Sequence, residues 1–326
     1  MTVRNRAAGM VLMVMVSPAA WAQAHSLDDV RFTGPLLTPS PSTLPQGQFF
    51  LQPYLVQTHG SGSYDDKGHR HALADASDTS LLSVLLSAGL TDRLAGELVM
   101  DSARSTQGGQ HSDGYRLADS ALRLRYLFRE GDPLTGKSAL AVMWGQALPT
   151  GRHDRLGDNL LNGQGSGAYR STLSLLGQAY HWLPNGRPLR WRWQARWSPS
   201  PRDVSLTGRS VYGTGQGFRG QVRPGSAVGA GLGLEYSIDV HWALALDLSA
   251  SHQSGNAVDG TVVVGDGQRQ RIHRRDRASR SYSIAPAVEY NVSDQLGFLV
   301  GVQASLPGGR NSATYVSPQV SMALSF

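Results

Sequence analysis

The nine residues 189–197, LRWRWQARW, decide the fold, because they carry two different surfaces on alternating positions. The apolar row is Leu189, Trp191, Trp193, Ala195 and Trp197, and the polar, mainly cationic row is Arg190, Arg192, Gln194 and Arg196. Neighbouring side chains of a β-strand point to opposite faces, so a strand separates these rows, whereas a helix mixes them. A soluble sandwich normally buries its aromatic row and exposes its charges, but a transmembrane barrel turns the aromatic row toward lipid. We therefore expect a membrane β-barrel.

The composition is compatible with such a barrel. The 326 residues include 38 glycines and no cysteine, and the formal net charge is +6. The mean hydropathy is only -0.26, which suits a barrel because only every second strand residue meets lipid. No uncharged apolar run approaches the roughly 20 residues that a membrane-spanning helix needs. Without disulfides, the stability must come from a closed hydrogen-bonded sheet or a large core.

The first residues have the features of a secretory signal peptide. Arg4 and Arg6 precede a short apolar run at residues 7–16, and small residues follow at Ala20, Ala22 and Ala24. This order predicts a signal peptide over residues 1–22, with cleavage after residue 24 as the alternative. A short buried N-terminal helix is the competing interpretation.

Residues 23–46 contain prolines at positions 35, 39, 41 and 45 and show no strand or helix periodicity. This composition predicts either an extended periplasmic segment or a partial plug of the barrel, and the sequence leaves both open.

Residues 47–326 are expected to form one all-β, transmembrane, antiparallel up-and-down barrel of about twelve strands. The predicted strands are 48–57, 79–90, 93–104, 115–128, 138–148, 169–182, 189–197, 226–236, 242–252, 280–291, 296–305 and 314–326. Short connections (91–92, 130–137, 183–188, 237–241 and 292–295) alternate with long polar ones (59–78, 105–114, 149–167, 198–225 and 253–279). Short periplasmic turns that alternate with long external loops are typical of outer-membrane barrels. We expect export to the outer membrane of a Gram-negative bacterium.

The chain ends in Phe326, after Val316, Val320, Met322 and Leu324 on the same face of the last strand. A terminal aromatic residue on such a strand resembles the signal that the barrel-assembly machinery recognises, so this machinery is an expected partner.

Two stretches carry motifs that go beyond the general pattern of a barrel. The first is LPTG at residues 148–151, followed by GQGSG at 163–167. The second is the C-terminal run 286–326, with VEYN at 288–291, GV at 301–302, GRN at 309–311 and the final strand. In these motifs the chain resembles a family of outer-membrane transporters that is named for the meta-pathway of phenol degradation. The resemblance implies an outer-membrane channel for small organic molecules.

Charged residues are expected to line the lumen. They are Glu97, Asp101, Arg123, Arg125, Arg190, Arg192, Arg196 and Glu235. An arginine-rich lining favours anions in an open pore, whereas a lattice of internal salt bridges would fill a narrow barrel. A barrel of about twelve strands lies between the filled and the open size classes, so both interpretations stand.

Two further features suggest contacts with the membrane. Residues 268–280 contain seven basic and one acidic side chain and would either bind lipopolysaccharide phosphates or remain a solvated loop. Pro53 and Pro318 lie on the two strands that must close the barrel, and neither has an N–H for the ladder. We hypothesise that they weaken this seam and allow apolar solutes to leave sideways; alternatively, the missing donors face no partner.

An enzyme is the main alternative to a channel. His252 and Ser254 continue an outward row and resemble the His-x-Ser pair of outer-membrane lipid-ester hydrolases, with Asn256 or Asp259 as a possible orienting group. A structural or adhesion barrel with a filled lumen is the second alternative. We expect that the protein is not an enzyme and that it binds no metal, cofactor or nucleic acid. The favoured function is passive uptake of small organic solutes, including hydrophobic or aromatic ones.

Overall fold

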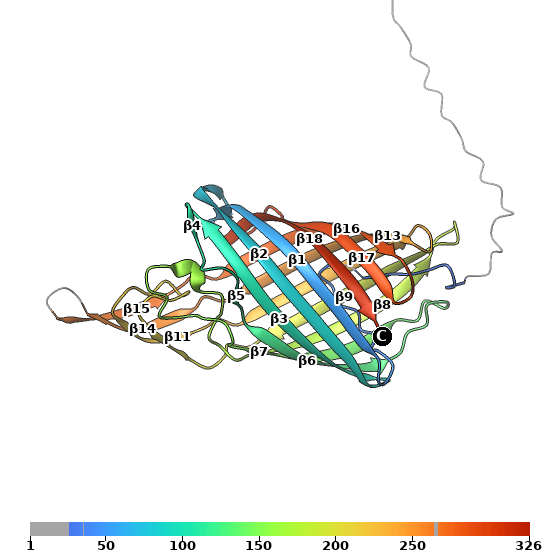
Figure 1. The fold of residues 1–326 in the computed structure, drawn as a ribbon, viewed down its shortest axis with the longest axis horizontal. Helices are drawn as coiled ribbons and strands as arrows, with labels where there is room; N and C mark the ends of the chain where they lie inside the picture. The colour runs from blue at the N-terminus through green and yellow to red at the C-terminus, as the bar shows by residue number, and fades with distance from the viewer. Residues whose placement is uncertain (1–25, 35, 264–266) are drawn as a thin grey trace, which may run out of the picture.

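The computed structural model describes residues 26–34, 36–263 and 267–326, which form a tilted barrel of long antiparallel strands (Figure 1). The predicted signal peptide lies outside the described residues. Within the described ranges, the barrel has twelve strands: β1 (Phe49–Tyr64), β2 (Arg70–Thr91), β3 (Leu94–Gln107), β6 (Ser120–Arg129), β7 (Ala139–Leu148), β8 (Arg170–Trp182), β9 (Pro188–Ser198), β12 (Ala227–Ser237), β13 (Trp242–Gln253), β16 (Ser279–Asn291), β17 (Leu296–Ser305) and β18 (Ser312–Ser325).

Each of these strands pairs with its neighbours in chain order, and β1 pairs with β18 to close the sheet. The predicted all-β, transmembrane, antiparallel up-and-down barrel is therefore confirmed. Within the described part of the chain, no helix combines the length and the apolar character needed to span a bilayer.

The alternation along β9 shows why this sequence closes into a barrel with an apolar exterior. Trp191 and Trp197 are 37% and 53% exposed on the outside, whereas Arg190 and Arg192 are only 8% and 6% exposed inside. Trp193 lies across the outer face of Gly177 on β8, where any side chain would collide with the indole ring. Equivalent outward rows of Leu, Val and aromatic residues on the other strands complete a wall that suits lipid.

The two ends of the barrel differ. Short turns join the strands at one end, which we call the turn end, and the long connections lie at the other, the loop end. The C-terminus lies at the turn end, and β11, β14 and β15 project beyond the loop end (Figure 1).

Four of the expected long loops are partly strands. Residues 59–78 are not one loop, because β1 and β2 continue to Tyr64 and Arg70 and pair almost to their tips. Their outer parts are polar on both faces, so they have no lipid-facing row by which the sequence could identify them. Residues 105–114 contain the short β4 (Gln110–His111). Residues 115–128, predicted as one strand, divide into the short β5 (Arg116–Leu117) and β6.

The other two form a separate four-stranded sheet at the loop end. It consists of β10 (Val204–Thr207), β11 (Phe218–Arg223), β14 (Ala257–Val263) and β15 (Arg269–Arg275). Phe218, Val222 and Val258 build a small core on one face of this sheet, together with Leu206 and Ala168. The pairing of β11 with β14 joins connections that are far apart in sequence, which explains why local patterns miss it.

Residues 31–34 and 36–46, which we call the inner segment, lie inside the barrel near the turn end. Arg31 forms an ion pair with Asp294 in the turn between β16 and β17, and the N–H of Gln46 donates to Asp92 in the turn between β2 and β3. Between these anchors, Leu36 packs against Ala245, Ala285, Ala287 and Leu299 of the inner wall. The contacts thus lie inside the barrel, as in the plug arrangement that the sequence had left open.

A charge on the outer wall tests the membrane-spanning arrangement. Val300 lies at the middle of β17 and is 56% exposed on the outside. We expect Val300→Arg to lower the free energy of unfolding in lipid vesicles by about 2–4 kcal/mol, because the charge would lie in hydrocarbon. Leu90→Arg, next to the turn end of β2, is the control and should cost about 0–1 kcal/mol. Equal losses at both positions would contradict this arrangement.

Candidate functional site

The turn half of the lumen contains a buried cluster of two arginines around the carboxylate of Glu235, with the buried Glu289 beside it. The Arg190 guanidinium donates two hydrogen bonds to Glu235, at 2.6 and 2.5 Å, and Arg192 forms an ion pair with the same carboxylate at 3.2 Å. Glu235 is fully buried, so its charge requires both partners. The Arg190 guanidinium also lies over the ring of Phe32 in the inner segment, 4.1 Å from its centroid.

A second cluster joins β3 and β6. Glu97, which is 5% exposed, contacts Arg125 directly and lies 3.7 Å from Arg123. Arg125 also donates to the backbone carbonyl of Ser42 in the inner segment, at 2.7 Å. Asp101 lies on the inner face of β3 beyond this cluster, and no ion pair joins it to another described residue. In this half of the barrel, then, the arginines are largely neutralised by internal partners.

Inward carboxylates that sequence reasoning missed hold the inner segment. Asp247 accepts the backbone N–H groups of Leu37 and Thr38, both at 3.1 Å, and Glu289 accepts that of Thr33 at 2.5 Å. Both positions could have been found from the sequence, because each alternates with outward Leu, Val or Tyr residues on its strand. The sequence did not show what these carboxylates bind, because the inner segment has no strand or helix periodicity that would place it in the lumen.

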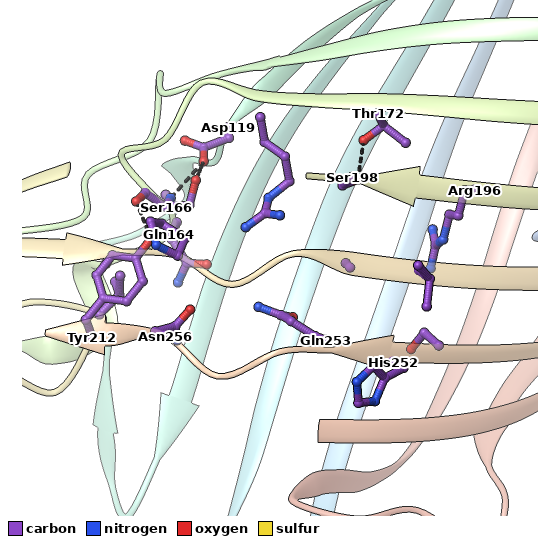
Figure 2. Close-up of a pocket in the computed structure, with 18 residues that line it drawn as sticks. Asp119, Gln164, Ser166, Thr172, Arg196, Ser198, Tyr212, His252, Gln253 and Asn256 are labelled. Atoms are coloured by element: carbon purple, nitrogen blue, oxygen red, sulfur yellow. Dashed lines mark hydrogen bonds between the residues drawn. The ribbon is translucent and has the colours of Figure 1, made fainter. Parts of the chain in front are cut away.

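A cavity lies toward the loop end of the lumen. It has a volume of about 710 Å³ and lies between β8, β9, β12, β13 and the loops above them. Figure 2 shows Arg196 and His252 at its strand side and Asp119, Ser166 and Tyr212 at its loop side. Arg196 and Arg170 both line this cavity, and neither forms an ion pair with another described residue. Arg170 donates to the carbonyl of Gly225 at 2.9 Å, so Arg196 is the less engaged of the two.

Hydrogen bonds within the loops fix the wall of this cavity. Asp119 accepts the N–H and the hydroxyl of Ser166, at 2.7 and 2.6 Å, and the Tyr212 hydroxyl donates to the Ser166 carbonyl at 2.6 Å. Burial raises the pKa of Tyr212 to about 12, so it remains a neutral donor. The GQGSG stretch thus builds the wall of the cavity.

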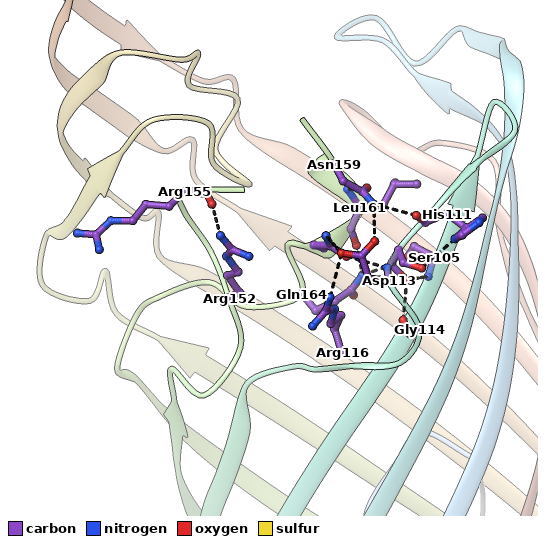
Figure 3. A network of polar contacts seen from close by, with 12 residues as sticks. Ser105, His111, Asp113, Gly114, Arg116, Arg152, Arg155, Asn159, Leu161 and Gln164 are labelled. Carbon is purple, nitrogen blue, oxygen red and sulfur yellow. Dashed lines mark hydrogen bonds and ion pairs between the residues drawn. The ribbon is translucent and has the colours of Figure 1, made fainter. Parts of the chain in front are cut away.

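A second loop network lies beside it (Figure 3). Asp113 accepts the side-chain N–H of Asn162 at 2.8 Å and that of Asn159 at 3.3 Å, and it forms an ion pair with Arg116. These contacts join the β4–β5 connection to the short helix η2 (Leu160–Asn162). The hydrogen bond from Asn162, followed by Arg116, lowers the pKa of Asp113.

His252 and Ser254 are not arranged as a catalytic pair. The Ser254 hydroxyl accepts the N–H of Ser226 at 2.8 Å, and no hydrogen bond joins it to His252 in the described chain. Asn256 bonds Gly225 and Asp276, and Asp259 pairs with His273 and Arg271, so neither orients the imidazole. These polar groups instead hold the bends where β12, β13 and β16 leave the barrel.

The basic stretch 268–280 is mostly strand β15 rather than a loop. Arg269, Arg271 and Arg275 share one face of the small sheet with Arg219 and Arg223 of β11, opposite the face that carries Phe218. Arg274 points to the other face and donates to the carbonyls of Tyr212 and Gly213.

The ends of the two closing strands meet at the turn end. The backbone groups of Phe49 and Phe326 exchange hydrogen bonds at 2.8 and 3.0 Å, and their rings stack with centroids 6.1 Å apart. Pro53 and Pro318 both lie on the outer face of this seam, four residues apart along it, which is about 13 Å.

No protein-family model matches the chain, and no curated protein matches its sequence. Among solved structures, the COG4313 outer membrane channel from Pseudomonas putida F1 aligns with a TM-score of 0.63 and 16% identity, covering 89% of this chain and 100% of that one. The chain therefore shares its barrel fold with an outer membrane channel. The similarity to the transporter family noted from the sequence motifs remains a prediction.

Two other barrels align more weakly. The translocator domain of the autotransporter NalP from Neisseria meningitidis has a TM-score of 0.46 and 12% identity, with 85% of this chain and 88% of that one covered. A mutant of the TodX monoaromatic hydrocarbon channel has a TM-score of 0.37 and 12% identity, with 88% and 92% covered. Scores this low support no conclusion about function.

The buried arginine cluster makes a prediction about stability. We expect Glu235→Gln to lower the free energy of unfolding by about 3–5 kcal/mol, because two buried guanidinium groups lose their counter-charge. Glu130→Gln is the matched control: Glu130 pairs with Arg93, but their side chains are 60% and 54% exposed. That loss should stay within about 1 kcal/mol in urea titrations of the refolded barrel. Similar values for both variants would show that the cluster does not hold the lumen together.

The Asp113 network makes a prediction about pH. A carboxyl group whose pKa is lowered by folding stabilises the fold above its unfolded pKa, about 3.9, and this contribution disappears as the pH falls through the folded value. We therefore expect protection of residues 159–163 from amide exchange, corrected for intrinsic rates, to persist from pH 7 to 5 and to fall below about pH 4. Asp113→Asn should be less protected already at pH 7. Protection in Asp113→Asn that equals the wild-type value at pH 7 would contradict this assignment.

Proposed function

We propose that this protein is a channel for passive diffusion of small organic molecules across a bacterial outer membrane. The observation that carries the proposal is the division of the lumen. The loop half holds a cavity of about 710 Å³, whereas the inner segment crosses the turn half and bonds its walls. A purely structural barrel has no need for such a cavity, and a general porin has no need for a segment across its lumen.

The inner segment favours solutes that carry no net charge. Phe32 and Leu37 of the inner segment are apolar and only partly buried, and the arginines at this level are occupied by Glu97 and Glu235. Apolar constrictions exclude hydrated ions by dewetting. Small uncharged molecules, including hydrophobic or aromatic ones, are therefore the proposed solutes. Arg196 would contact polar substituents of a solute in the cavity above.

The proposed location follows from the same architecture. Short turns would face the periplasm and the small four-stranded sheet the outside of the cell. In this orientation, the arginine face of β11 and β15 would meet lipopolysaccharide phosphates, and Phe326 would serve as the assembly signal at the periplasmic end.

Conductance and uptake test the proposed channel together. In planar bilayers, we expect the complete mature protein to show little steady ionic current, and a variant without residues 26–44 to show a several-fold larger one. Arg196→Gln should reduce any anion preference of that larger current, whereas Arg192→Gln should act mainly on stability. In intact cells, the complete protein should increase the uptake of a neutral aromatic solute such as toluene. Equal uptake by cells with and without the protein would refute the proposed function.

A further inference from the structure

Three prolines lie on the outer face of neighbouring strands where the barrel closes. They are Pro53 on β1, Pro286 on β16 and Pro318 on β18. In the described barrel strands, the other proline is Pro188, the first residue of β9, where no long ladder is interrupted. Prolines inside strands are otherwise found at sheet edges, because they cannot donate to a ladder. A closed barrel has no free edge, so their positions require an explanation.

The two prolines at the seam lie with their nitrogens toward the opposite strand. The reciprocal hydrogen bonds of Phe49 and Phe326 fix which residues of β1 and β18 face each other across the ladder. Every second pair along the seam is therefore a hydrogen-bonded pair, counting from Phe49 and Phe326. In two of these pairs, the Pro53 nitrogen faces the carbonyl of Met322, and the Pro318 nitrogen faces that of Gln57. The seam register is interrupted at these two places, while the β1–β2 and β17–β18 ladders run unbroken through the same prolines. The missing donors therefore do face partners.

Pro286 adds a third gap in the next ladder but one. The hydrogen bond between Val292 and Leu296 shows which residue pairs of the β16–β17 ladder are hydrogen-bonded pairs. Pro286 and Val302 are one of these pairs, so the Pro286 nitrogen faces the carbonyl of Val302. The register omits this pair, although the β13–β16 ladder passes through Pro286 without a break. Val302 in turn lies opposite Pro318. Pro286, Val302, Pro318 and Gln57 thus form one row across four strands, and two of its three ladders lack a donor.

These gaps are costly in a membrane. A backbone carbonyl in hydrocarbon has no water to replace the lost donor, and a closed barrel normally pairs all such groups. The seam and the β16–β17 interface are therefore held by fewer hydrogen bonds than their length allows.

The inner side of this sector is braced by the inner segment as well as by wall residues such as Leu299. Gly301 on β17 has no side chain, and a Cβ there would lie 2.5 Å from the terminal methyl of Leu36. Leu36 also covers Ala285 and Ala287 of β16. Nearer the loop end, short polar side chains join the strands. They include Thr58 and Ser317, whose hydroxyl oxygens lie 2.8 Å apart across the seam.

We propose that the sector formed by β16, β17, β18 and β1 is a lateral exit, which parts at the β1–β18 seam and releases small apolar solutes from the lumen into the bilayer. Leu36 braces the sector, so movement of the inner segment and opening of the wall are coupled. The proposal rests on the proposed function, and it explains how a solute leaves a lumen whose turn half is crossed by the inner segment.

A reversible lock on the seam tests the proposal. The protein has no cysteine, so Thr58→Cys/Ser317→Cys introduces a single possible disulfide across the seam. The matched control is Ser251→Cys/Ser281→Cys, because these hydroxyl oxygens also face each other, at 2.7 Å, but across the unbroken β13–β16 ladder. In intact cells that make the full chain, disulfide formation is verified by gel mobility, and toluene uptake is measured before and after reduction.

We expect the oxidised seam pair to lower toluene uptake to the level of cells without the protein, and reduction to restore it. The oxidised control pair should transport like wild type. As a second measurement, Pro53→Ala/Pro318→Ala returns both N–H groups and should slow uptake, whereas Pro188→Ala should not. Unchanged uptake with the seam locked overturns the lateral exit but leaves the channel intact. If wild type itself adds no uptake, the proposed function fails, and the lateral exit fails with it.

Discussion

The structure depends on one constraint: inside a bilayer, the backbone can satisfy its hydrogen bonds only within the protein. A closed sheet meets this requirement, and the pairing of β1 with β18 provides the closure. Once the sheet is closed, the period of two along each strand assigns every side chain to lipid or lumen. The tryptophans and arginines of β9 are an extreme example, since a shift of one residue would place guanidinium groups in hydrocarbon. Closure and register are thus specified together by the alternation.

The same constraint explains which parts of the fold could be predicted from the sequence. Lipid-facing rows identify all twelve barrel strands among the described residues and their alternating short turns. They do not identify the water-exposed ends of β1 and β2 or the pairing of β11 with β14, because neither meets lipid. The inner segment, too, has no periodicity, and its position follows from contacts with Asp247 and Glu289 that lie more than two hundred residues away.

For the candidate site, the sequence identified charged lumen residues but not how they divide the lumen. Arg190, Arg192 and Arg125 look like an anion-selective lining when read one strand at a time. In three dimensions, Glu235 and Glu97 neutralise them, and the cavity with Arg196 lies nearer the loop end. Pairing across strands, which the sequence does not show, decides whether an arginine can meet a solute or holds the wall together. A third proline, Pro286, was readable as an interruption of an outward row, yet its meaning depends on the register with β17.

The two sides of the barrel are consequently held together by interactions of different strength. Between β3 and β6 and between β9 and β12, buried ion pairs add to continuous ladders. In the sector formed by β16, β17, β18 and β1, two of the three ladders have gaps. The inner contacts there are hydroxyl and amide hydrogen bonds, such as Thr58 with Ser317 and Gln303 with Ser283. Breaking a buried ion pair leaves uncompensated charges, whereas separating neutral hydroxyl groups costs much less. An opening of the wall therefore costs least at the closing strands, where only neutral groups separate. The buried ion pairs keep the opposite wall rigid during such an opening.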